Sequence, residues 1–395
     1  MIAAKILFWF SLFIITYSYI GYGILLFFLT RIKQAFLRAP SSATSEIFEP
    51  EVTLIVAAFN EEDCIEEKIS NSLQLDYPRQ LLKFIIISDG STDRTPLIAG
   101  SHKEVQVLHQ SQRKGKVAAM NRAMQFVTTP YVISSDANTS LNSDCIRQIV
   151  KHYRDPKVGG VAGEKKLISS AQDGAAGVGE GLYWKYESFL KKMDSQLYSV
   201  VGAAGELFSF RADLFVNTRE DMIIEDFVQS LEICLKGYVI RYEPGAFAIE
   251  DSSPSMKEEE KRKIRISAGA FQAMIHLRAL FNIFKYPVLS FQFISHRVLR
   301  WTICPLCVVI LFFSNAVILL YNQHSLYILF FALQSIGYLL AFSGWLLAHR
   351  NIRVKLLYLP YYFLFMNLSV FMGFARFIRK NQSNLWEKAS RKKTK

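Results

Sequence analysis

The chain has 395 residues, of which 51% are hydrophobic and 14% aromatic, and its formal net charge is +12. A positive charge of this size would suit a nucleic-acid-binding protein, but aromatic residues are not interleaved with arginine as base stacking requires. Basic residues instead follow apolar stretches, at Arg31, Lys33 and Arg38 and throughout 376–395. Basic residues in such places usually face the cytosol and anionic lipid. We therefore predict a lipid bilayer as a partner and exclude nucleic acid.

Four apolar stretches dominate the two ends of the chain, at residues 6–30, 302–321, 325–348 and 357–378. Each has about 20 residues or more, enough for a helix to cross a hydrocarbon core of ~30 Å. The first stretch is too long for the core of a signal peptide, so we interpret it as a retained anchor rather than a cleaved signal. The sequence thus predicts a multi-pass protein of the cell membrane whose central segment lies in the cytosol.

The number of C-terminal crossings stays open. A cytosolic segment followed by three crossings would place the basic tail outside, against the tendency of basic residues to stay inside. Either one stretch is re-entrant, with Pro360 supporting a broken helix, or part of 281–300 also crosses. Residues 265–296 mix apolar side chains with His276 and His296, a pattern typical of helices that lie in the membrane interface.

The central segment alternates strand-like and helical patterns. Val52–Phe59 is a continuous apolar run, as a buried parallel strand requires, and an amphipathic segment follows from Glu61 to Leu75. Further strands are predicted at 83–89, 105–110 and 131–136, with a helix near 115–126. This alternation predicts an α/β fold, with a parallel sheet covered by helices on both faces.

Polar residues follow three of the predicted strands, at Asn60-Glu61, at 88–95 (SDGSTDRT) and at 134–140 (SSDANTS). Ligands of such sheets bind at the carboxyl ends of the strands. Helix capping could explain each cluster alone, because Ser, Asp and Asn are preferred N-caps. It explains poorly why Asp89 and Asp136 both follow directly on strands, so we expect a binding site here.

These motifs resemble the nucleotide-binding half of the family 2 glycosyltransferases, which have the GT-A fold. The resemblance is carried by LIVAAFNEE, IIISDGSTDRT, RKGKVAAMNRAM and SSDANTSL, and it continues through GGVAGEKKL, GAAGELFSFRADLF, IIEDFVQSLEICLKGYVIRYEPGA and KRKIRISAGAFQA. It covers most of residues 50–285, and the order of the motifs makes it specific. The apolar stretches resemble those of the branch that includes cellulose, chitin, hyaluronan and poly-N-acetylglucosamine synthases. The resemblance implies an α/β, Rossmann-like nucleotide-sugar domain inserted between transmembrane helices.

The resemblance also implies a UDP-sugar as the donor. Asp89 is similar to the aspartate that accepts hydrogen bonds from the uracil ring, and Ala58 and Glu61 match positions that line the base and the ribose. Lys116 can neutralise phosphate charge as a point cation.

Asp136 resembles the first acid of the family's DxD motif, which holds Mg²⁺ or Mn²⁺. These hard cations take oxygen ligands and stabilise the departing nucleoside diphosphate. This chain reads Asp136-Ala137-Asn138, so an amide replaces the second acid. The resemblance therefore implies a metal site at Asp136 and Asn138 that is weaker than a two-acid site. Asn138→Asp would then be expected to tighten metal binding.

Glu225-Asp226 resembles the TED motif, with Ile224 in the place of the threonine. The resemblance implies that Asp226, with Glu225 beside it, removes the proton of the acceptor hydroxyl in a displacement that inverts the anomeric carbon. Alternatively, both acids belong to the first turn of a helix that reaches Lys236, where they complement the helix dipole. The upstream motifs favour the catalytic interpretation.

RKIRI, from Arg262 to Ile266, stands where the chain-extending relatives have QxxRW. Arg262 takes the place of the glutamine, and Arg265 matches the arginine and could bind the diphosphate bidentately. Ile266 replaces the tryptophan that gives the acceptor sugar an aromatic face. Tyr183 or Trp184 could take over that role.

The predicted organisation is an anchor at 1–31, a linker at 32–50, a GT-A domain at 51–260, interfacial amphipathic helices at 261–298, transmembrane helices at 299–380 and a basic tail at 381–395. The leading interpretation is a metal-dependent glycosyltransferase that extends a polysaccharide. Two alternatives stay open: transfer of a single sugar to a lipid-linked acceptor, and a non-catalytic membrane protein that senses nucleotide sugar. The apolar stretches contain few polar residues to line a polymer channel, so transfer of a single sugar stays open. The intact Asp226 argues against a non-catalytic sensor.

Overall fold

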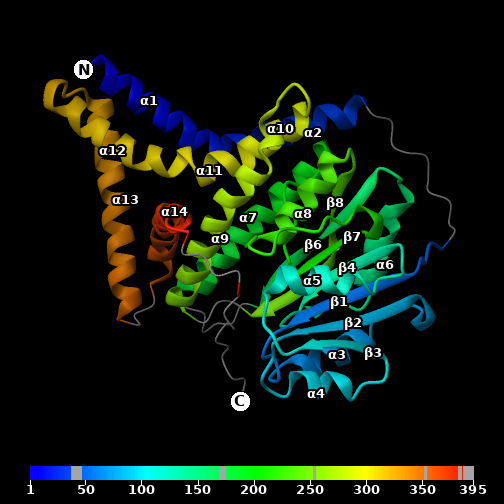
Figure 1. Cartoon of the computed structure of the whole chain (residues 1–395). Coiled ribbons are helices and arrows are strands. Elements are labelled where there is room, and N and C mark those ends of the chain that lie inside the picture. The colour runs from blue at the N-terminus through cyan, green and yellow to red at the C-terminus, as the bar shows by residue number, and fades with distance from the viewer. Residues whose placement is uncertain (37–46, 169–174, 252–254, 351–353, 381–384, 386–395) are drawn as a thin grey trace.

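The computed structural model describes residues 1–36, 47–168, 175–251, 255–350, 354–380 and 385. Nearly all of the predicted basic tail and most of the predicted linker lie outside the described residues, so those boundaries stay predictions. A sheet with its covering helices forms one part of the molecule, and long helices form an arm beside it (Figure 1).

A mixed sheet forms the centre of the domain, and its described strands follow the order β3-β2-β1-β4-β7-β6-β8-β5. The strands are β1 (Val52–Ala58), β2 (Leu82–Asp89), β3 (Val105–Gln110), β4 (Tyr131–Asp136), β5 (Ser140–Leu141), β6 (Val158–Ile168), β7 (Leu207–Arg211) and β8 (Val239–Asp251). Strands β1 to β4 are parallel, which confirms the predicted half of the sheet. Strand β7 runs antiparallel to β4 and to β6. The sheet is therefore mixed, whereas the alternation of elements had predicted parallel strands alone.

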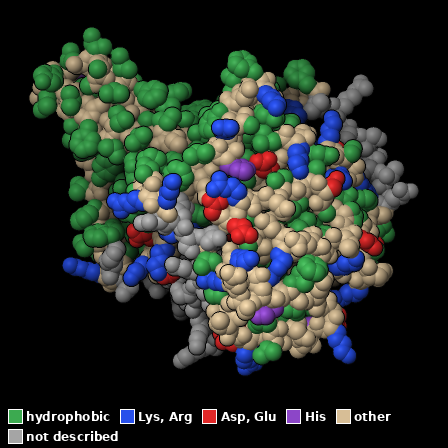
Figure 2. Space-filling view, viewed as in Figure 1, with side chains coloured by type: hydrophobic (Ala, Val, Ile, Leu, Met, Phe, Trp, Pro, Cys, Tyr) green, Lys and Arg blue, Asp and Glu red, His purple; other side chains and the backbone are tan. Residues whose placement is uncertain are grey.

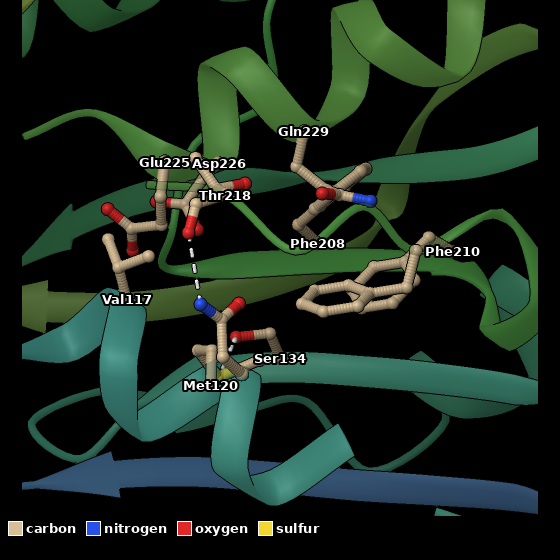
Figure 3. Close-up of a pocket in the computed structure, with 11 residues that line it drawn as sticks. Val117, Met120, Ser134, Phe208, Phe210, Thr218, Glu225, Asp226 and Gln229 are labelled. Carbon is tan, nitrogen blue, oxygen red and sulfur yellow. Dashed lines mark hydrogen bonds between the residues drawn. The ribbon is translucent and has the colours of Figure 1, made fainter. Parts of the chain in front are cut away.

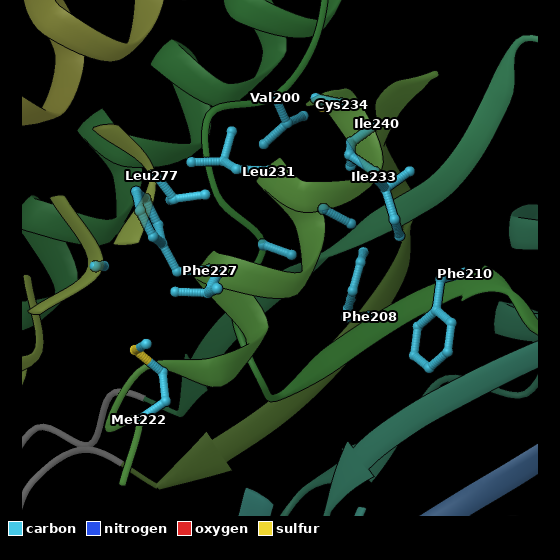
Figure 4. Packing of buried hydrophobic residues seen from close by; sticks show 14 of the residues in the cluster. Val200, Phe208, Phe210, Met222, Phe227, Leu231, Ile233, Cys234, Ile240 and Leu277 are labelled. Carbon is cyan, nitrogen blue, oxygen red and sulfur yellow. The ribbon is translucent and has the colours of Figure 1, made fainter. Parts of the chain in front are cut away.

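Two apolar cores lie on the two faces of this sheet. Because side chains alternate along a strand, Ile55 of β1 packs into one core, and Leu54 and Val56 pack into the other. The first core contacts α5 (Lys116–Met124), α8 (Glu225–Leu235) and α9 (Met256–His276), and the second contacts α3 (Ile65–Leu73), α4 (Thr95–Gly100) and α6 (Cys145–Val150). Figure 4 shows Phe227 and Leu231 of α8 within the first core. Each such side chain contributes about 1.5–3 kcal/mol when fully buried, so this core fixes α8 against the sheet.

The arm consists of helices with apolar surfaces. Its helices are α1 (Ile2–Thr16) and α2 (Tyr22–Phe36), joined by a π-helical turn (Tyr17–Gly21), followed by α12 (Ile303–Tyr321), α13 (Ser325–His349) and α14 (Lys355–Ile378). By length and composition, the described residues contain four candidate membrane spans, Ile2–Phe36, Ile303–Tyr321, Ser325–Ala348 and Leu356–Ile378. They coincide with the four apolar stretches of the sequence. Hydrophobic side chains cover this arm, whereas charged side chains of both signs are spread over the domain (Figure 2).

The segment predicted to lie in the interface joins the domain to the arm. It contains α9, α10 (Pro287–Phe293), a π-helical turn (Ile294–Val298) and α11 (Leu299–Trp301). Helix α9 packs against α14 and against α7 (Ala175–Leu197). None of the four candidate spans found in the described residues falls within 281–300. The structure therefore gives no support to an extra crossing there.

Candidate active site

Three carboxylates from distant parts of the chain meet at the ammonium group of Lys116. Its Nζ lies 2.9 Å from Asp136 Oδ1, 3.1 Å from Glu225 Oε1 and 3.6 Å from Asp226 Oδ2. Lys116 begins α5, Asp136 ends β4, and the other two acids form the first turn of α8. The predicted base, Asp226, and the predicted metal ligand, Asp136, thus contact the same cation.

Two glycines make this close approach possible. Gly115 precedes α5 with a φ of 100°, a conformation that residues with a side chain rarely adopt. Gly205 lies against the cluster, where an added Cβ would come within 2.7 Å of Lys116 Nζ and would also overlap Asp226. Any side chain at position 205 would therefore force the lysine and the acid apart.

A second lysine lies beside the first group. Lys165 Nζ is 2.7 Å from Glu206 Oε1 and also pairs with Glu250, and its side chain is only 1% exposed. Asn138 Nδ2 donates a hydrogen bond of 2.8 Å to Glu250 Oε1. This bond joins the loop after β4 to β8, so the two lysines and their acids form one continuous set.

We call this set the active cluster: Lys116, Lys165, Asp136, Glu206, Glu225, Asp226 and Glu250. Two lysines face five carboxylates within this set, and Lys68, Lys191 and Arg262 act on its acids from outside it. Burial, reinforced by Glu225, raises the pKa of Asp226 well above its ordinary value. Burial also raises the pKa of Asp136, and the neighbouring Glu206 and Glu250 add to this effect. The excess negative charge indicates a preference for a cationic ligand.

The chemistry of these donors fits a divalent metal ion, because carboxylate and amide oxygens are the ligands that Mg²⁺ and Mn²⁺ prefer. Among the described residues, no three Asp, Glu, His or Cys side chains are already arranged around a common point as ligands. The ammonium group of Lys116 instead lies between Asp136 and the acids of α8.

A small cavity of about 20 Å³ adjoins the acids of α8, which is room for roughly one water molecule. Figure 3 shows Glu225 and Asp226 at its edge, with Val117 and Met120 of α5 below them and Phe208 of β7 to the side. The largely apolar wall excludes water from one side of the carboxylates. This exclusion is consistent with the raised pKa of Asp226.

Asp89 lies at the predicted edge of the sheet but is fully buried. Its oxygens accept hydrogen bonds from the backbone N–H groups of Lys114 (3.0 Å) and Gly115 (2.7 Å) and from the side chain of Gln110 (3.0 Å). Buried backbone N–H groups need acceptors, and this carboxylate supplies one to the loop that carries Lys116. Asp89 therefore supports the loop that carries Lys116, and its expected contact with uracil stays a prediction.

Ala58 and Glu61 follow the same edge at the end of β1 and are 1% and 8% exposed. The backbone N–H of Glu61 donates to Thr95 Oγ1 (2.8 Å), which ties this turn to α4. The Arg113 guanidinium stacks 3.5 Å from the centre of the Phe59 ring. No sequence pattern predicts that stack, because its two residues are far apart in the chain.

Arg262 does not extend freely toward a diphosphate. Its Nη2 lies 2.5 Å from Glu180 Oε1, and its Nε lies 3.4 Å from Glu259 Oε2. Both acids are fully buried, so they hold the guanidinium inside the interface of α7 and α9. The predicted contact of Arg262 with the donor stays a prediction. Arg265 lies about one turn further along α9 and is half-buried, and its predicted role stays a prediction.

Helix α9 also packs against the segment that precedes Glu225 and Asp226, through Gln272 and Gly269. The Gln272 side chain accepts from the N–H of Ile223 (3.2 Å) and donates to the carbonyl of Asp221 (2.8 Å). An added Cβ at Gly269 would lie 2.9 Å from Ile223 Cβ. A glycine inside a helix costs about 1 kcal/mol relative to alanine, so its presence there was the available signal of close packing.

Comparison with known proteins supports the family resemblance and the fold. Residues 53–217 match the family model described as glycosyl transferase family 2. The chain carries a glycosyl transferase family 2 domain. The resemblance found in the sequence is thereby confirmed.

Among curated proteins, the chain is similar to the poly-beta-1,6-N-acetyl-D-glucosamine synthase of Staphylococcus aureus (strain MSSA476). The two are 27% identical over 274 residues, which cover 67% of this chain and 64% of that protein. The protein of the same name from Staphylococcus epidermidis is 24% identical over 296 residues, with 71% and 70% covered. The chain therefore matches somewhat less than two thirds of the S. aureus relative.

Among solved structures, the chain is similar to the mannosyltransferase PcManGT from Pyrobaculum calidifontis in complex with GDP-Man and Mn²⁺. The TM-score is 0.67 at 21% identity, with 94% of this chain and 99% of that chain covered. This similarity confirms the predicted fold class, an α/β domain of the GT-A type flanked by long apolar helices.

Proposed function

We propose that the chain is an inverting glycosyltransferase that moves a sugar from a UDP-sugar to a growing polysaccharide at the membrane. The observation that carries this proposal is the convergence of Asp226 and Asp136 on Lys116 Nζ, at 3.6 and 2.9 Å. A base for the acceptor and charged groups for the donor diphosphate must face the same anomeric carbon. In the active cluster, both kinds of group contact the same ammonium group, that of Lys116.

In the proposed reaction, the acceptor hydroxyl gives its proton to the Asp226 carboxylate as its oxygen bonds to the anomeric carbon. The bond between that carbon and the diphosphate oxygen breaks, and UDP leaves from the opposite face. A raised pKa suits Asp226 for this role, because a general base works best when its pKa lies near the working pH. Glu225 raises that pKa, and Lys116 provides positive charge for the diphosphate.

Asp136 and the amide oxygen of Asn138 would hold Mg²⁺ or Mn²⁺, which when bound supplies positive charge to the departing diphosphate. The excess of negative charge in the active cluster supports this assignment. The Mn²⁺ bound to the similar mannosyltransferase is consistent with it.

The named activity of the Staphylococcus relatives supports a polysaccharide as the acceptor and makes UDP-N-acetylglucosamine the first donor to test. The four candidate spans support embedding in the cell membrane, with the catalytic domain on the cytosolic side, where UDP-sugars are made available.

A second candidate, transfer of a single sugar to a lipid-linked acceptor, is favoured by the acceptor side of the site. Ile266 offers no aromatic face, and the Trp184 ring has the ammonium groups of Lys165 and Lys191 each 5.1 Å from its centre. A ring that carries two cations is a poor platform for a neutral sugar. Weak hold on the acceptor would give short products.

The decisive experiment incubates the purified protein, in detergent with Mn²⁺, with a panel of radiolabelled UDP-sugars, and sizes both the water-soluble and the lipid-extractable products. We expect one donor to be consumed and label to enter polymer, with Asp226→Asn as the matched blank. Label confined to the lipid fraction would select the second candidate. A protein that binds UDP-sugar without transferring it would overturn both and favour the sensing alternative.

A further inference from the structure

The amide that replaces the second acid of the metal motif has a partner on another strand. Asn138 Nδ2 lies 2.8 Å from Glu250 Oε1. Sheet register creates this contact, because β5 pairs antiparallel with β8 through Ser140↔Ile249 and Leu141↔Ala248. The residues just before β5 are therefore brought beside the end of β8.

This contact fixes the orientation of the Asn138 amide. An ionised carboxylate only accepts hydrogen bonds, so the nitrogen of the amide must face Glu250. The amide oxygen, its only metal-ligating atom, is turned the other way. Lys165 pairs with the second oxygen of Glu250, and the Glu250 side chain is only 16% exposed, so the carboxylate is itself held in place.

We propose that Glu250 is the displaced second acid of the metal-binding motif. It holds the nitrogen of the Asn138 amide and so leaves the amide oxygen for the metal, while Lys165 holds Glu250 itself in place. Glu250 is a positioning residue, and the inference rests on the proposed metal site at Asp136 and Asn138. Groups that orient metal ligands in this way typically change metal affinity by about 10–100-fold when they are removed.

The pairing reverses the expectation drawn from the sequence for Asn138→Asp. In that variant two carboxylates would face each other across a contact that is 2.8 Å long in the native protein, and like charges at such a distance repel. The Asn138→Asp/Glu250→Gln double variant exchanges the acid and the amide. It keeps the total charge, and the glutamine nitrogen can donate to the new carboxylate.

The test measures Mn²⁺ binding by electron paramagnetic resonance on the full-length protein in detergent, without donor or acceptor. We expect Asn138→Asp and Glu250→Gln each to weaken binding about 10-fold or more, and the double variant to recover most of the loss. Tighter binding by Asn138→Asp alone would overturn the proposal. The proposal would also be overturned if the losses of Mn²⁺ affinity in the two single variants simply added in the double variant.

Glu243→Gln is the matched control, since it makes the same change on the same strand. Glu243 pairs instead with His152 Nε2 (2.7 Å) and Lys151 Nζ (2.8 Å), so Mn²⁺ binding should be unchanged. A wild-type protein that binds no Mn²⁺ would overturn the inference. A protein that shows the expected binding pattern but transfers no sugar would contradict the proposed function and still support the role of Glu250.

Discussion

The protein contains two buried groups of charged side chains that differ in their charge balance. The active cluster has five carboxylates and two lysines. The other group, which we call the support cluster, consists of Glu187, Asp194, His296, Arg297 and Arg300. There both arginines pair with Glu187, with Arg297 Nη1 at 2.8 Å and Arg300 Nη1 at 2.7 Å, and Asp194 pairs with His296.

The support cluster joins the domain to the arm. His296 is fully buried, with Nδ1 2.6 Å from Asp194 and Nε2 3.3 Å from Glu187, whereas the sequence had placed it in the membrane interface. Arg300 donates to the carbonyl of Ser18 in the first candidate span (3.2 Å), and Arg297 donates to the carbonyl of Val201 (3.1 Å). Each charge in this cluster has a partner inside the protein.

This difference indicates that the support cluster stabilises the fold, whereas the active cluster is suited to bind a ligand. Buried ions are costly unless they are paired, so matched charges can persist without any external partner. In the active cluster carboxylates outnumber lysines, and burial raises the pKa values of Asp136 and Asp226. Both clusters are buried, so the ratio of acidic to basic side chains is the property that distinguishes them.

The largest expected effect comes from removing the base of the active cluster. Asp226→Asn should lower the rate of transfer about 10²–10⁴-fold, because the amide keeps the shape but cannot accept the proton. The unfolding temperature should stay the same or rise, since one unmatched negative charge is gone. Initial rates and thermal unfolding of the same preparations measure both. Asp221→Asn, at an exposed acid in the preceding loop, is the control, and normal turnover by Asp226→Asn would remove this residue from the mechanism.

The opposite result is expected in the support cluster. Glu187→Gln should lower the free energy of unfolding by about 3–5 kcal/mol, because two buried arginines lose their shared partner. The rate per folded molecule should change little. Glu232→Gln, which breaks a half-exposed pair with His276, should cost only about 0–1 kcal/mol. An unchanged unfolding temperature combined with lost activity would show that Glu187 belongs to the catalytic machinery.

The pH dependence of the rate gives an intermediate effect. Transfer requires ionised Asp226, and its pKa is raised, so the rate should increase with pH through a midpoint above the ordinary aspartate value of about 3.9. Lys116 lowers this pKa, so Lys116→Met should move the midpoint to higher pH. A pH profile of kcat/KM measures the shift, and Glu187→Gln should leave the midpoint in place. A wild-type midpoint near the ordinary value would contradict the environment described for Asp226.

The smallest expected effect concerns the proposed acceptor side, at Ile266 of α9. Ile266→Trp should lengthen the products, because an aromatic face contributes on the order of 0.5–1.5 kcal/mol of contact. Gel sizing of products from wild type, Ile266→Trp and Trp184→Ala measures it. Lower activity in Ile266→Trp together with shorter products in Trp184→Ala would instead place the acceptor on Trp184.

Local sequence patterns are enough to predict the parallel half of the sheet and the strand ends that carry the site. Continuous apolar runs such as Val52–Phe59 require burial on both faces, and the carboxyl ends of parallel strands share one edge. The shared edge therefore predicts that Ala58, Asp89 and Asp136 lie in one region. The apolar stretches likewise predicted the four candidate spans, because their length and composition are local properties.

The partners of these side chains, in contrast, depend on the folded chain. Asp89 became a support for backbone N–H groups, and Arg262 became a partner of Glu180, because each was the nearest complementary group once the chain had folded. The same holds for Glu250, which meets Asn138 through the register of two strands more than 100 residues apart. Local patterns fix which residues reach the site, but electrostatic pairing depends on distances across the fold, and no local pattern encodes them.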